Sequence, residues 1–115
     1  MKTIKQEITP FQRKVYEAVA RIPRGRVMTY RGLALAIGCR SSQAVGQALK
    51  RNPFAPDVPC HRVIKSDLTL GGYAGAGEGV EVDRKLRLLT AEGVVFVDGR
   101  LQEPERVIVS LQDTL

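Results

Sequence analysis

The chain has 115 residues and a net charge of +6, with 43% hydrophobic and 26% charged residues. These are ordinary values for a globular protein, so they argue against disorder and predict a single domain over residues 1–115. No apolar run reaches the ~18–20 residues of a membrane span, and residues 1–7 lack the apolar segment of a signal peptide. Two cysteines are too few for a secreted disulfide scaffold, so we expect an intracellular protein with no membrane partner.

The positive charge is concentrated in the first half of the chain. Residues 1–51 hold eleven Lys and Arg against two Glu, whereas residues 52–115 hold seven basic and ten acidic side chains. A basic half on a small domain is typical of proteins that bind nucleic acid, because clustered cations attract phosphates. A solvated basic face without a partner explains the charge equally well, so charge alone leaves both interpretations open.

A first helix is predicted from Pro10 to Ile22. Thr9 can cap this helix, Pro10 suits the first helical position, and Gln12 completes a capping box. Apolar residues then recur at helical spacing as far as Ile22, and Pro23 and Gly25 end the helix.

Two shorter helices are predicted after an extended piece at residues 27–29. The first runs from Tyr30 to Ile37 and ends at Gly38, and the second runs from about Ser42 to Arg51. Two short helices joined by a tight turn, preceded by another helix, are typical of a helix-turn-helix DNA-binding core.

The second half of the chain mixes loops with short regular elements. A loop at 52–59 contains three prolines, and residues 60–64 are predicted to form a buried strand. Five glycines within residues 66–79 predict a mobile loop around Tyr73. A helix is expected from residue 81 to residue 92, because apolar residues line one face and a glycine follows.

The tail, residues 94–115, is predicted to be β structure. Asp98-Gly99 between residues 94–97 and 100–102 is a strong hairpin signal. Residues 107–111 alternate apolar and polar side chains and are predicted to form a last strand. The expected fold class is therefore α/β but mostly α, a winged-helix-like domain with a helix-turn-helix core and a short C-terminal β hairpin.

Cys60 and His61 are adjacent, and His61 is the only histidine of the chain. A thiol is nucleophilic as the thiolate, which a neighbouring imidazole or a cation such as Arg62 favours. The pair alone fits a buried structural cysteine and a hydrogen-bonded core histidine equally well, so both interpretations stay open. Cys39 is expected to be a partly buried turn residue. No Cys and His cluster has the spacing of a zinc site, so no metal is expected.

Motifs of the chain resemble those of the O6-alkylguanine-DNA alkyltransferase family, the methylated-DNA–protein-cysteine methyltransferases. Residues 59–63, with the letters PCHRV, resemble the active-site signature of that family. Other matching motifs follow in the same order over roughly residues 11–93, namely residues 27–30, 44–46, 52–53, 72–75 and 88–93. Several separated motifs in the right order argue strongly against a chance match.

The resemblance implies a repair enzyme that is consumed by its own reaction. Cys60 looks like the acceptor that takes the alkyl group irreversibly from O6 of guanine in double-stranded DNA, with no cofactor. The relay of Cys, His, a water and Glu in that family corresponds here to Cys60, His61 and Glu92. In such a relay the carboxylate orients the imidazole, which removes the thiol proton through water. Asn52 matches an Asn that hydrogen-bonds near the active-site turn.

The resemblance also implies contacts with a flipped nucleotide. Because O6 of a stacked guanine is out of reach of a buried thiolate, the base must leave the duplex. Tyr30 matches a Tyr that crowds the 3′ phosphate of the target, and Tyr73 matches a Tyr that donates to N3 of the departing base. Val63, Ala74 and Gly75 are expected to shape the base pocket.

The helix at residues 42–51 resembles the recognition helix of that family, which enters the minor groove. Ala44 and Gly46 suit this role, because a narrow groove requires close approach of the backbone. The basic side chains expected to contact DNA or substrate are Lys50, Arg51 and Arg62. Gln43 stands where the family places an Arg that fills the gap left by the flipped base, and Arg40 is the alternative for that role.

Two other functions remain as alternatives. A start of the first helix near residue 10 and a tail at 94–115 resemble the alkyltransferase-like proteins, which bind lesions and recruit excision-repair proteins. Those proteins replace the acceptor cysteine, whereas this chain keeps Cys60, so the enzyme is favoured. A winged-helix regulator fits the charge but leaves residues 59–63 and Glu92 unexplained. We expect a monomer that acts in the cytoplasm, on the nucleoid or in the nucleus, depending on the host.

Overall fold

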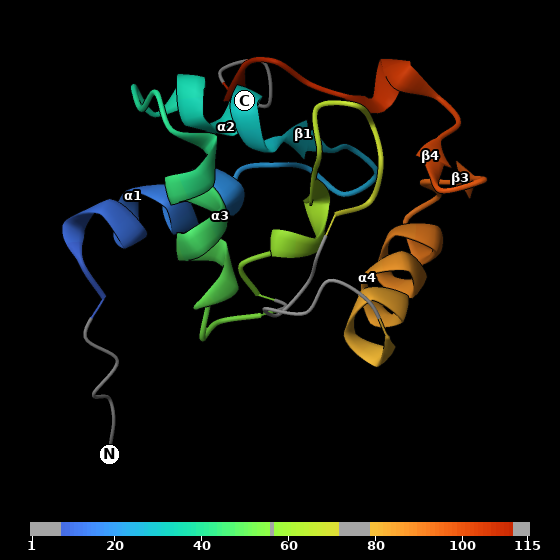
Figure 1. The fold of residues 1–115 in the computed structure, drawn as a ribbon, viewed down its shortest axis with the longest axis horizontal. Helices are drawn as coiled ribbons and strands as arrows, with labels where there is room; N and C mark the ends of the chain where they lie inside the picture. Colours follow the sequence, from blue (N-terminus) through green and yellow to red (C-terminus); the bar gives the residue numbers. More distant parts are fainter. Residues whose placement is uncertain (1–7, 56, 72–78, 112–115) are drawn as a thin grey trace.

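The computed structural model describes residues 8–55, 57–71 and 79–111. In these residues α1, α2 and α3 gather on one side of the molecule, and α4 lies apart from them on the other side, next to β3 and β4 (Figure 1). The elements in chain order are α1 (Pro10–Val19), β1 (Met28–Thr29), α2 (Tyr30–Ala36), α3 (Ser42–Lys50), the 3-10 turn η1 (Cys60–Arg62), β2 (Val63–Ile64), α4 (Val80–Ala91), β3 (Phe96–Val97), β4 (Arg100–Leu101) and the 3-10 turn η2 (Pro104–Arg106).

The start of α1 is confirmed in atomic detail. The Thr9 hydroxyl accepts a hydrogen bond from the Gln12 amide at 3.0 Å, and the Gln12 side chain accepts one from the Thr9 amide at 2.9 Å. The predicted end at Ile22 is wrong, because α1 ends at Val19. Residues 20–22 form tighter turns instead, in which the Ile22 amide donates to the Val19 carbonyl three residues back.

The helix-turn-helix is formed by α2 and α3, which pack against each other and against α1. The Thr29 hydroxyl caps α2 by accepting from the Gly32 amide at 2.9 Å, and the Ser41 hydroxyl caps α3 by accepting from the Ala44 amide at 3.0 Å. The Tyr16 hydroxyl of α1 donates to the Ala48 carbonyl of α3 at 2.7 Å, so a buried hydrogen bond connects the first and third helices.

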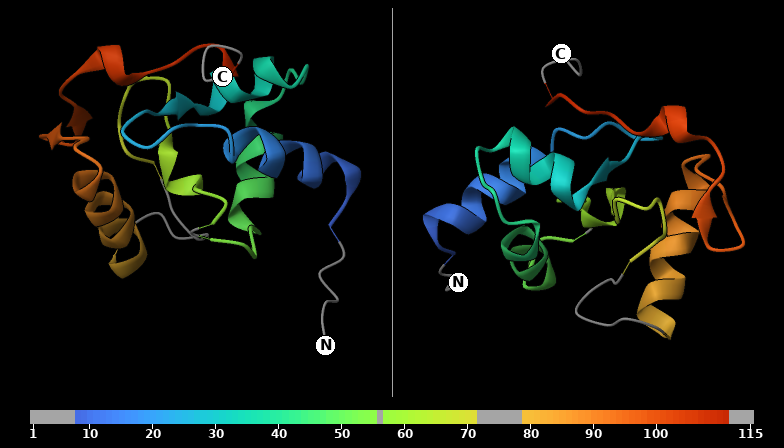
Figure 2. Two further views of the ribbon diagram at one scale, coloured as in Figure 1. Left: turned by 180° about the vertical axis from the view of Figure 1, so that it is seen from behind. Right: turned by 45° about the horizontal axis from the view of Figure 1, so that its top comes forward.

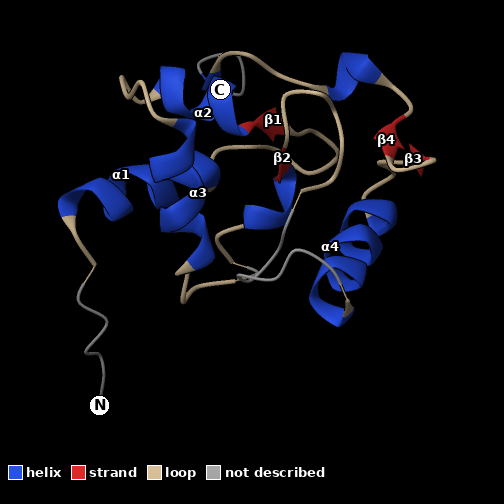
Figure 3. Cartoon of the chain, viewed as in Figure 1, coloured by secondary structure: helices blue, strands red, loops and turns tan. Residues whose placement is uncertain are grey.

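A short parallel pairing places the start of α2 beside the predicted reactive cysteine. β1 pairs with β2 in the register Met28 with Val63 and Thr29 with Ile64. The prediction of a strand over the whole of residues 60–64 is wrong, because residues 60–62 form η1 and only residues 63–64 are extended (Figure 3). The turn forms because the Arg62 amide donates back to the Pro59 carbonyl at 2.9 Å.

The tail confirms the hairpin but not the last strand. β3 and β4 pair antiparallel around Asp98 and Gly99, whose φ angles of +53° and +80° suit a tight hairpin turn. Residues 107–111 form no strand; Val107 makes an isolated bridge with Val27. The tail therefore runs along the loop that precedes β1, as Figure 2 shows.

The buried apolar side chains form two clusters that meet at β2. One cluster lies among α1, α2 and α3 and includes Cys60 and Val63. The other includes Ile64 and Leu89, so the two residues of β2 belong to different clusters. Among the described residues, no helix is both long enough and apolar enough to cross a bilayer.

Candidate active site

Cys60 is positioned by a turn that Asn52 braces. The Asn52 side chain donates to the Val58 carbonyl at 3.0 Å and accepts from the Phe54 amide at 2.9 Å. The Cys60 amide donates to the same Val58 carbonyl at 2.8 Å. Asn52 therefore holds the loop that delivers Cys60, and the cysteine is only 7% exposed.

His61 and Glu92 form a buried pair beside this cysteine. The 3-10 turn replaces the alternation of a strand, so that Cys60 and His61 are both buried. His61 Nε2 lies 2.9 Å from Glu92 Oε2. His61 Nδ1 is also buried, and no hydrogen-bond partner for it lies among the described residues.

Arg62 and the backbone of Gly25 complete the surroundings of Glu92. Arg62 Nε and Nη2 donate to the two carboxylate oxygens at 2.9 and 2.8 Å, and the Gly25 amide donates to Oε1 at 3.2 Å. The remaining Arg62 nitrogen donates to the Ile22 carbonyl at 2.7 Å. We expected Arg62 to contact DNA or substrate; the structure instead turns its guanidinium inward to Glu92, which sequence proximity could not reveal.

The charges around His61 and Glu92 determine the protonation states of both side chains. Burial would raise the pKa of Glu92, but hydrogen bonds from Arg62, His61 and Gly25, with the charge of Arg62, lower it to about 2. Burial lowers the pKa of His61, and the charges of Arg62 and Lys85 add to this, outweighing the opposing effect of Glu92.

At neutral pH His61 is therefore neutral while Glu92 is ionised. An ionised carboxylate can only accept a hydrogen bond, so Nε2 of His61 carries the proton. Nδ1 then presents its lone pair inside the protein. The pair thus holds a base that is ready to accept one proton, next to a cysteine.

Lys85 of α4 is a site residue that the sequence analysis missed. Its side chain is completely buried, and Nζ donates to the Val63 carbonyl at 2.8 Å and to the Leu70 carbonyl at 2.7 Å. Burial lowers the pKa of Lys85 to about 7, and a smaller electrostatic effect of the nearby Cys60 opposes this fall. Lys85 follows Val82 by three residues and precedes Leu89 by four, so a lysine on the apolar face of a predicted helix was the available signal.

Tyr30 and the exposed face of α3 line the same pocket. The pocket has a volume of about 390 Å³ and brings Tyr30 together with Gln43 and Gly46, and also with Gln47 and Lys65, which we did not predict. Burial, and to a lesser degree Cys60, raise the pKa of Tyr30 to about 12, so its hydroxyl is neutral. A Cβ added at Gly46 would meet no atom within 4 Å, so the fold itself does not require glycine there.

The other α3 residues that we expected to contact DNA are accessible to different degrees. Lys50 and Arg51 are exposed at the end of α3, and Ala44 is half-buried near its start. Val63 is fully buried in β2. Tyr73, Ala74 and Gly75 lie outside the described residues. Within the described ranges, no group of three or more His, Cys, Asp or Glu side chains could hold a metal ion.

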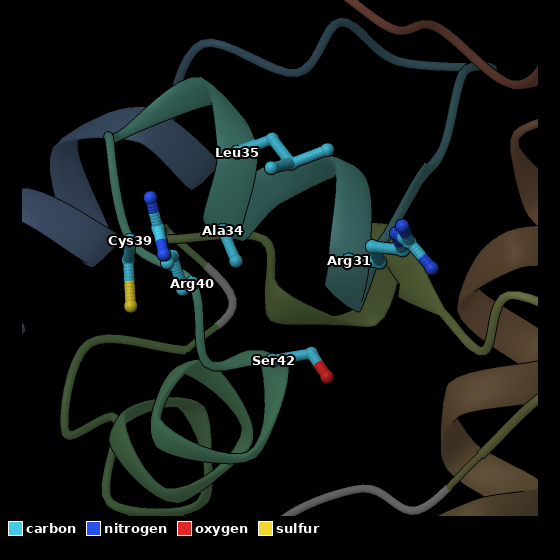
Figure 4. Close-up of a pocket in the computed structure, with 6 residues that line it drawn as sticks. All are labelled: Arg31, Ala34, Leu35, Cys39, Arg40 and Ser42. Carbon is cyan, nitrogen blue, oxygen red and sulfur yellow. The ribbon is translucent and has the colours of Figure 1, made fainter.

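Arg40 faces a different pocket from Gln43. A hollow of about 400 Å³ between α2 and the start of α3 is lined by Arg31, Cys39 and Arg40, among others (Figure 4). Cys39 is partly exposed in the turn, and its sulfur accepts a hydrogen bond from the Ser41 amide at 3.3 Å. Gln43, not Arg40, therefore shares the pocket of Tyr30.

Comparisons with known proteins agree with this geometry. The family model "6-O-methylguanine DNA methyltransferase, DNA binding domain" matches residues 10–94. The constitutive methylated-DNA–protein-cysteine methyltransferase of Bacillus subtilis is 49% identical over 94 residues, which cover 81% of this chain and 54% of that protein. The chain spans about half the length of the curated relatives that it matches.

Solved structures give the same answer for the fold. The crystal structure of Mycobacterium tuberculosis OGT in complex with DNA matches with a TM-score of 0.68 and 40% identity, over 75% of this chain and 51% of that one. The crystal structure of S. pombe Atl1 in complex with damaged DNA matches with a TM-score of 0.74 and 32% identity, over 90% of this chain and 98% of that one. The mostly helical α/β fold with a helix-turn-helix is thus confirmed, and the chain belongs to the family of the 6-O-methylguanine DNA methyltransferase DNA-binding domain.

Proposed function

We propose that this protein repairs O6-alkylguanine in double-stranded DNA by accepting the alkyl group on Cys60. The observation that carries the proposal is the spatial arrangement of Cys60, His61 and Glu92. In it Glu92 fixes the proton on Nε2 of His61 and leaves Nδ1 of His61 as the base. The relatives named as methylated-DNA–protein-cysteine methyltransferases support the same reaction.

The proposed reaction balances without a cofactor. His61 Nδ1 takes the thiol proton of Cys60, through a water molecule as the family relay implies, and Glu92 stabilises the imidazolium that forms. The thiolate attacks the alkyl carbon, so a carbon–sulfur bond forms while the bond from that carbon to O6 breaks. The electron pair of the broken bond stays on guanine, which takes up one proton. The products are S-alkylcysteine and unmodified guanine.

The DNA is proposed to bind across α3 and the pocket beside Tyr30. Lys50 and Arg51 supply positive charge for the phosphates, and the open space at Gly46 allows a close approach to a groove. The flipped base would enter past Tyr30, and the family resemblance implies that Tyr73 donates to N3 of the departing base. A DNA substrate places the proposed activity inside the cell, and we propose that a monomer suffices.

A second function is favoured by one comparison. S. pombe Atl1, solved with DNA that contains O6-carboxymethylguanine, matches over 90% of this chain, whereas the M. tuberculosis OGT matches over 75% of it. A lesion sensor that recruits excision-repair proteins would bind the same DNA without any transfer. The two functions differ at Cys60, because only the first forms a covalent product.

Intact mass spectrometry separates the two functions. The protein is mixed with an excess of a duplex oligonucleotide that contains O6-methylguanine, and we expect a gain of one methyl group. Cys60→Ser should abolish the gain while it leaves lesion binding in place, and Cys39→Ser is the matched control that should transfer normally. Tight binding of the lesion by the unaltered protein with no gain in mass would favour the sensor.

A further inference from the structure

The C-terminal segment contacts the active site through a loop, although it lies beyond the residues that the family model matches. That match ends at residue 94, and η2 spans Pro104–Arg106. The Val27 amide donates to the Arg106 carbonyl at 3.0 Å, and the Ile108 amide donates to the Val27 carbonyl at 2.9 Å. The segment therefore lies against Val27, the residue just before β1.

The side chain of Arg106 contacts Gly25, whose amide donates to Glu92. Arg106 Nη1 donates to the Gly25 carbonyl at 3.0 Å, while Arg106 Nε pairs with Glu103 one turn earlier. The Gly25 amide donates to Glu92 Oε1 at 3.2 Å. One peptide segment thus connects Arg106 to the carboxylate that holds His61.

The backbone conformation of Gly25 favours glycine. Its φ of +85° disfavours other residues, and a Cβ there would lie 3.4 Å from the Glu92 carbonyl oxygen and 3.5 Å from Arg106 Nη1. A neighbouring contact holds the same loop to α4, because Arg24 Nη2 donates to the Ala91 carbonyl at 2.8 Å. Arg106 holds the same loop through the Gly25 carbonyl.

We propose that Arg106 is a positioning residue of the active site, which holds the Gly25 amide on Glu92 and thereby offsets part of the negative charge that Glu92 presents to His61. The proposal rests on the proposed alkyl transfer for its kinetic consequence, but not for its electrostatic one. Without Arg106 the Gly25 carbonyl loses this hydrogen bond, and the Gly25 amide can move away from Glu92 Oε1. The Glu92 carboxylate then loses one of the donors that offset its negative charge, and the protonated form of His61 becomes more favourable.

Other charged groups around His61 also influence its pKa. Arg62 from η1 and Lys85 from α4 disfavour its protonation, and Glu92 favours it. Among the described residues, the hydrogen bond that links Arg106 to this cluster is the one to the Gly25 carbonyl. Arg26 offers a matched control, because it is exposed, lies next to Gly25 and donates to the Glu105 carbonyl of the tail at 3.2 Å.

The test compares Arg106→Ala, Arg106→Lys and Arg26→Ala in a Cys39→Ser background. His61 is the only histidine, so the imidazole signals in a nuclear magnetic resonance titration belong to it. We expect its titration midpoint to move to higher pH in Arg106→Ala, to return towards the parental value in Arg106→Lys, and to stay unchanged in Arg26→Ala.

The kinetic arm is single-turnover methyl transfer at saturating protein across the pH range. Arg106→Ala should transfer about tenfold more slowly on the acid side, where His61 is more protonated, and should approach the parental rate at high pH. An unchanged or lowered midpoint, or an equal loss of rate at every pH, would overturn the proposal and leave Arg106 a purely structural role. If the unaltered protein transfers no methyl group, the proposed function fails, while the titration still decides the role of Arg106.

Discussion

Arg62 holds both oxygens of the Glu92 carboxylate, with Nε to Oε1 at 2.9 Å and Nη2 to Oε2 at 2.8 Å. The same carboxylate accepts from His61, the neighbour of Arg62 in the chain. A planar guanidinium that donates twice fixes the orientation of a carboxylate more firmly than a lysine could. Glu92 is therefore oriented before any substrate arrives.

Arg62→Gln should destabilise the protein in a pH-dependent way. The pKa of Glu92 is lowered to about 2 in the folded state, so its ionisation contributes stability above its ordinary pKa that is lost as the pH falls towards about 2. Removing Arg62 leaves a buried carboxylate without its cation, which costs about 3 kcal/mol at neutral pH. Urea unfolding should show this loss, and the loss should shrink in acid. Arg84→Gln, which breaks an exposed pair with Glu81, should change stability by less than about 1 kcal/mol.

Lys85→Met should change the pH dependence of stability in the opposite range. Because the pKa of Lys85 falls from 10.5 to about 7 on folding, the unfolded chain binds a proton between these values that the folded chain does not. The free energy of unfolding of the parent therefore rises with pH across this interval, and the variant lacks that rise. We expect the stability of the variant relative to the parent to fall between about pH 7 and pH 10. A difference that stays constant with pH would contradict the lowered pKa.

His61→Ala should slow methyl transfer by about 100-fold or more, which is the usual contribution of a positioned acid–base group. Single-turnover rates at neutral pH measure this effect, and circular dichroism checks that the variant is folded. Binding of the lesion-containing duplex should be nearly unchanged, because His61 is buried. Transfer at the parental rate would show that the relay through His61 does not operate.

Lys50→Ala and Arg51→Ala should each weaken binding to all duplexes alike. If each side chain contacts a phosphate, the slope of log affinity against log salt concentration should fall by about one unit per variant. Titrations with fluorescent duplexes of two unrelated sequences would measure it. Arg87→Ala removes an exposed cation from α4 and is the matched control. A slope that is unchanged relative to the parent would place Lys50 and Arg51 away from the DNA.

Gln43→Arg should accelerate transfer from duplex DNA. A flipped base leaves a gap in the stack, and a planar cation fills that gap better than the shorter, neutral glutamine. Each 1.4 kcal/mol gained on the extruded state corresponds to about a tenfold faster rate. The free base O6-benzylguanine needs no flipping, so its rate should not change. If both rates change together, or neither changes, Gln43 is not the intercalating residue, and Arg40→Ala becomes the next variant to measure.

Local physical chemistry made much of the fold predictable from the sequence. Thr9 with Gln12, Thr29 and Ser41 are helix caps whose hydrogen bonds involve residues three positions apart, and Asp98-Gly99 defines a hairpin in the same local way. The PCHRV string likewise predicts Cys60 and His61 as the chemical centre, because a resemblance of consecutive residues needs no tertiary information.

Only the tertiary structure decided how these residues are used. Whether Arg62 turns inward or outward depends on Glu92, which follows thirty residues later, and the burial of Lys85 depends on carbonyls fifteen and twenty-two residues before it. Residues 107–111 alternate like a strand, yet Val27 gives them only one bridging partner. In each case the deciding contact joins distant parts of the chain, and its energy is realised only after the helices have packed; local periodicity cannot report it.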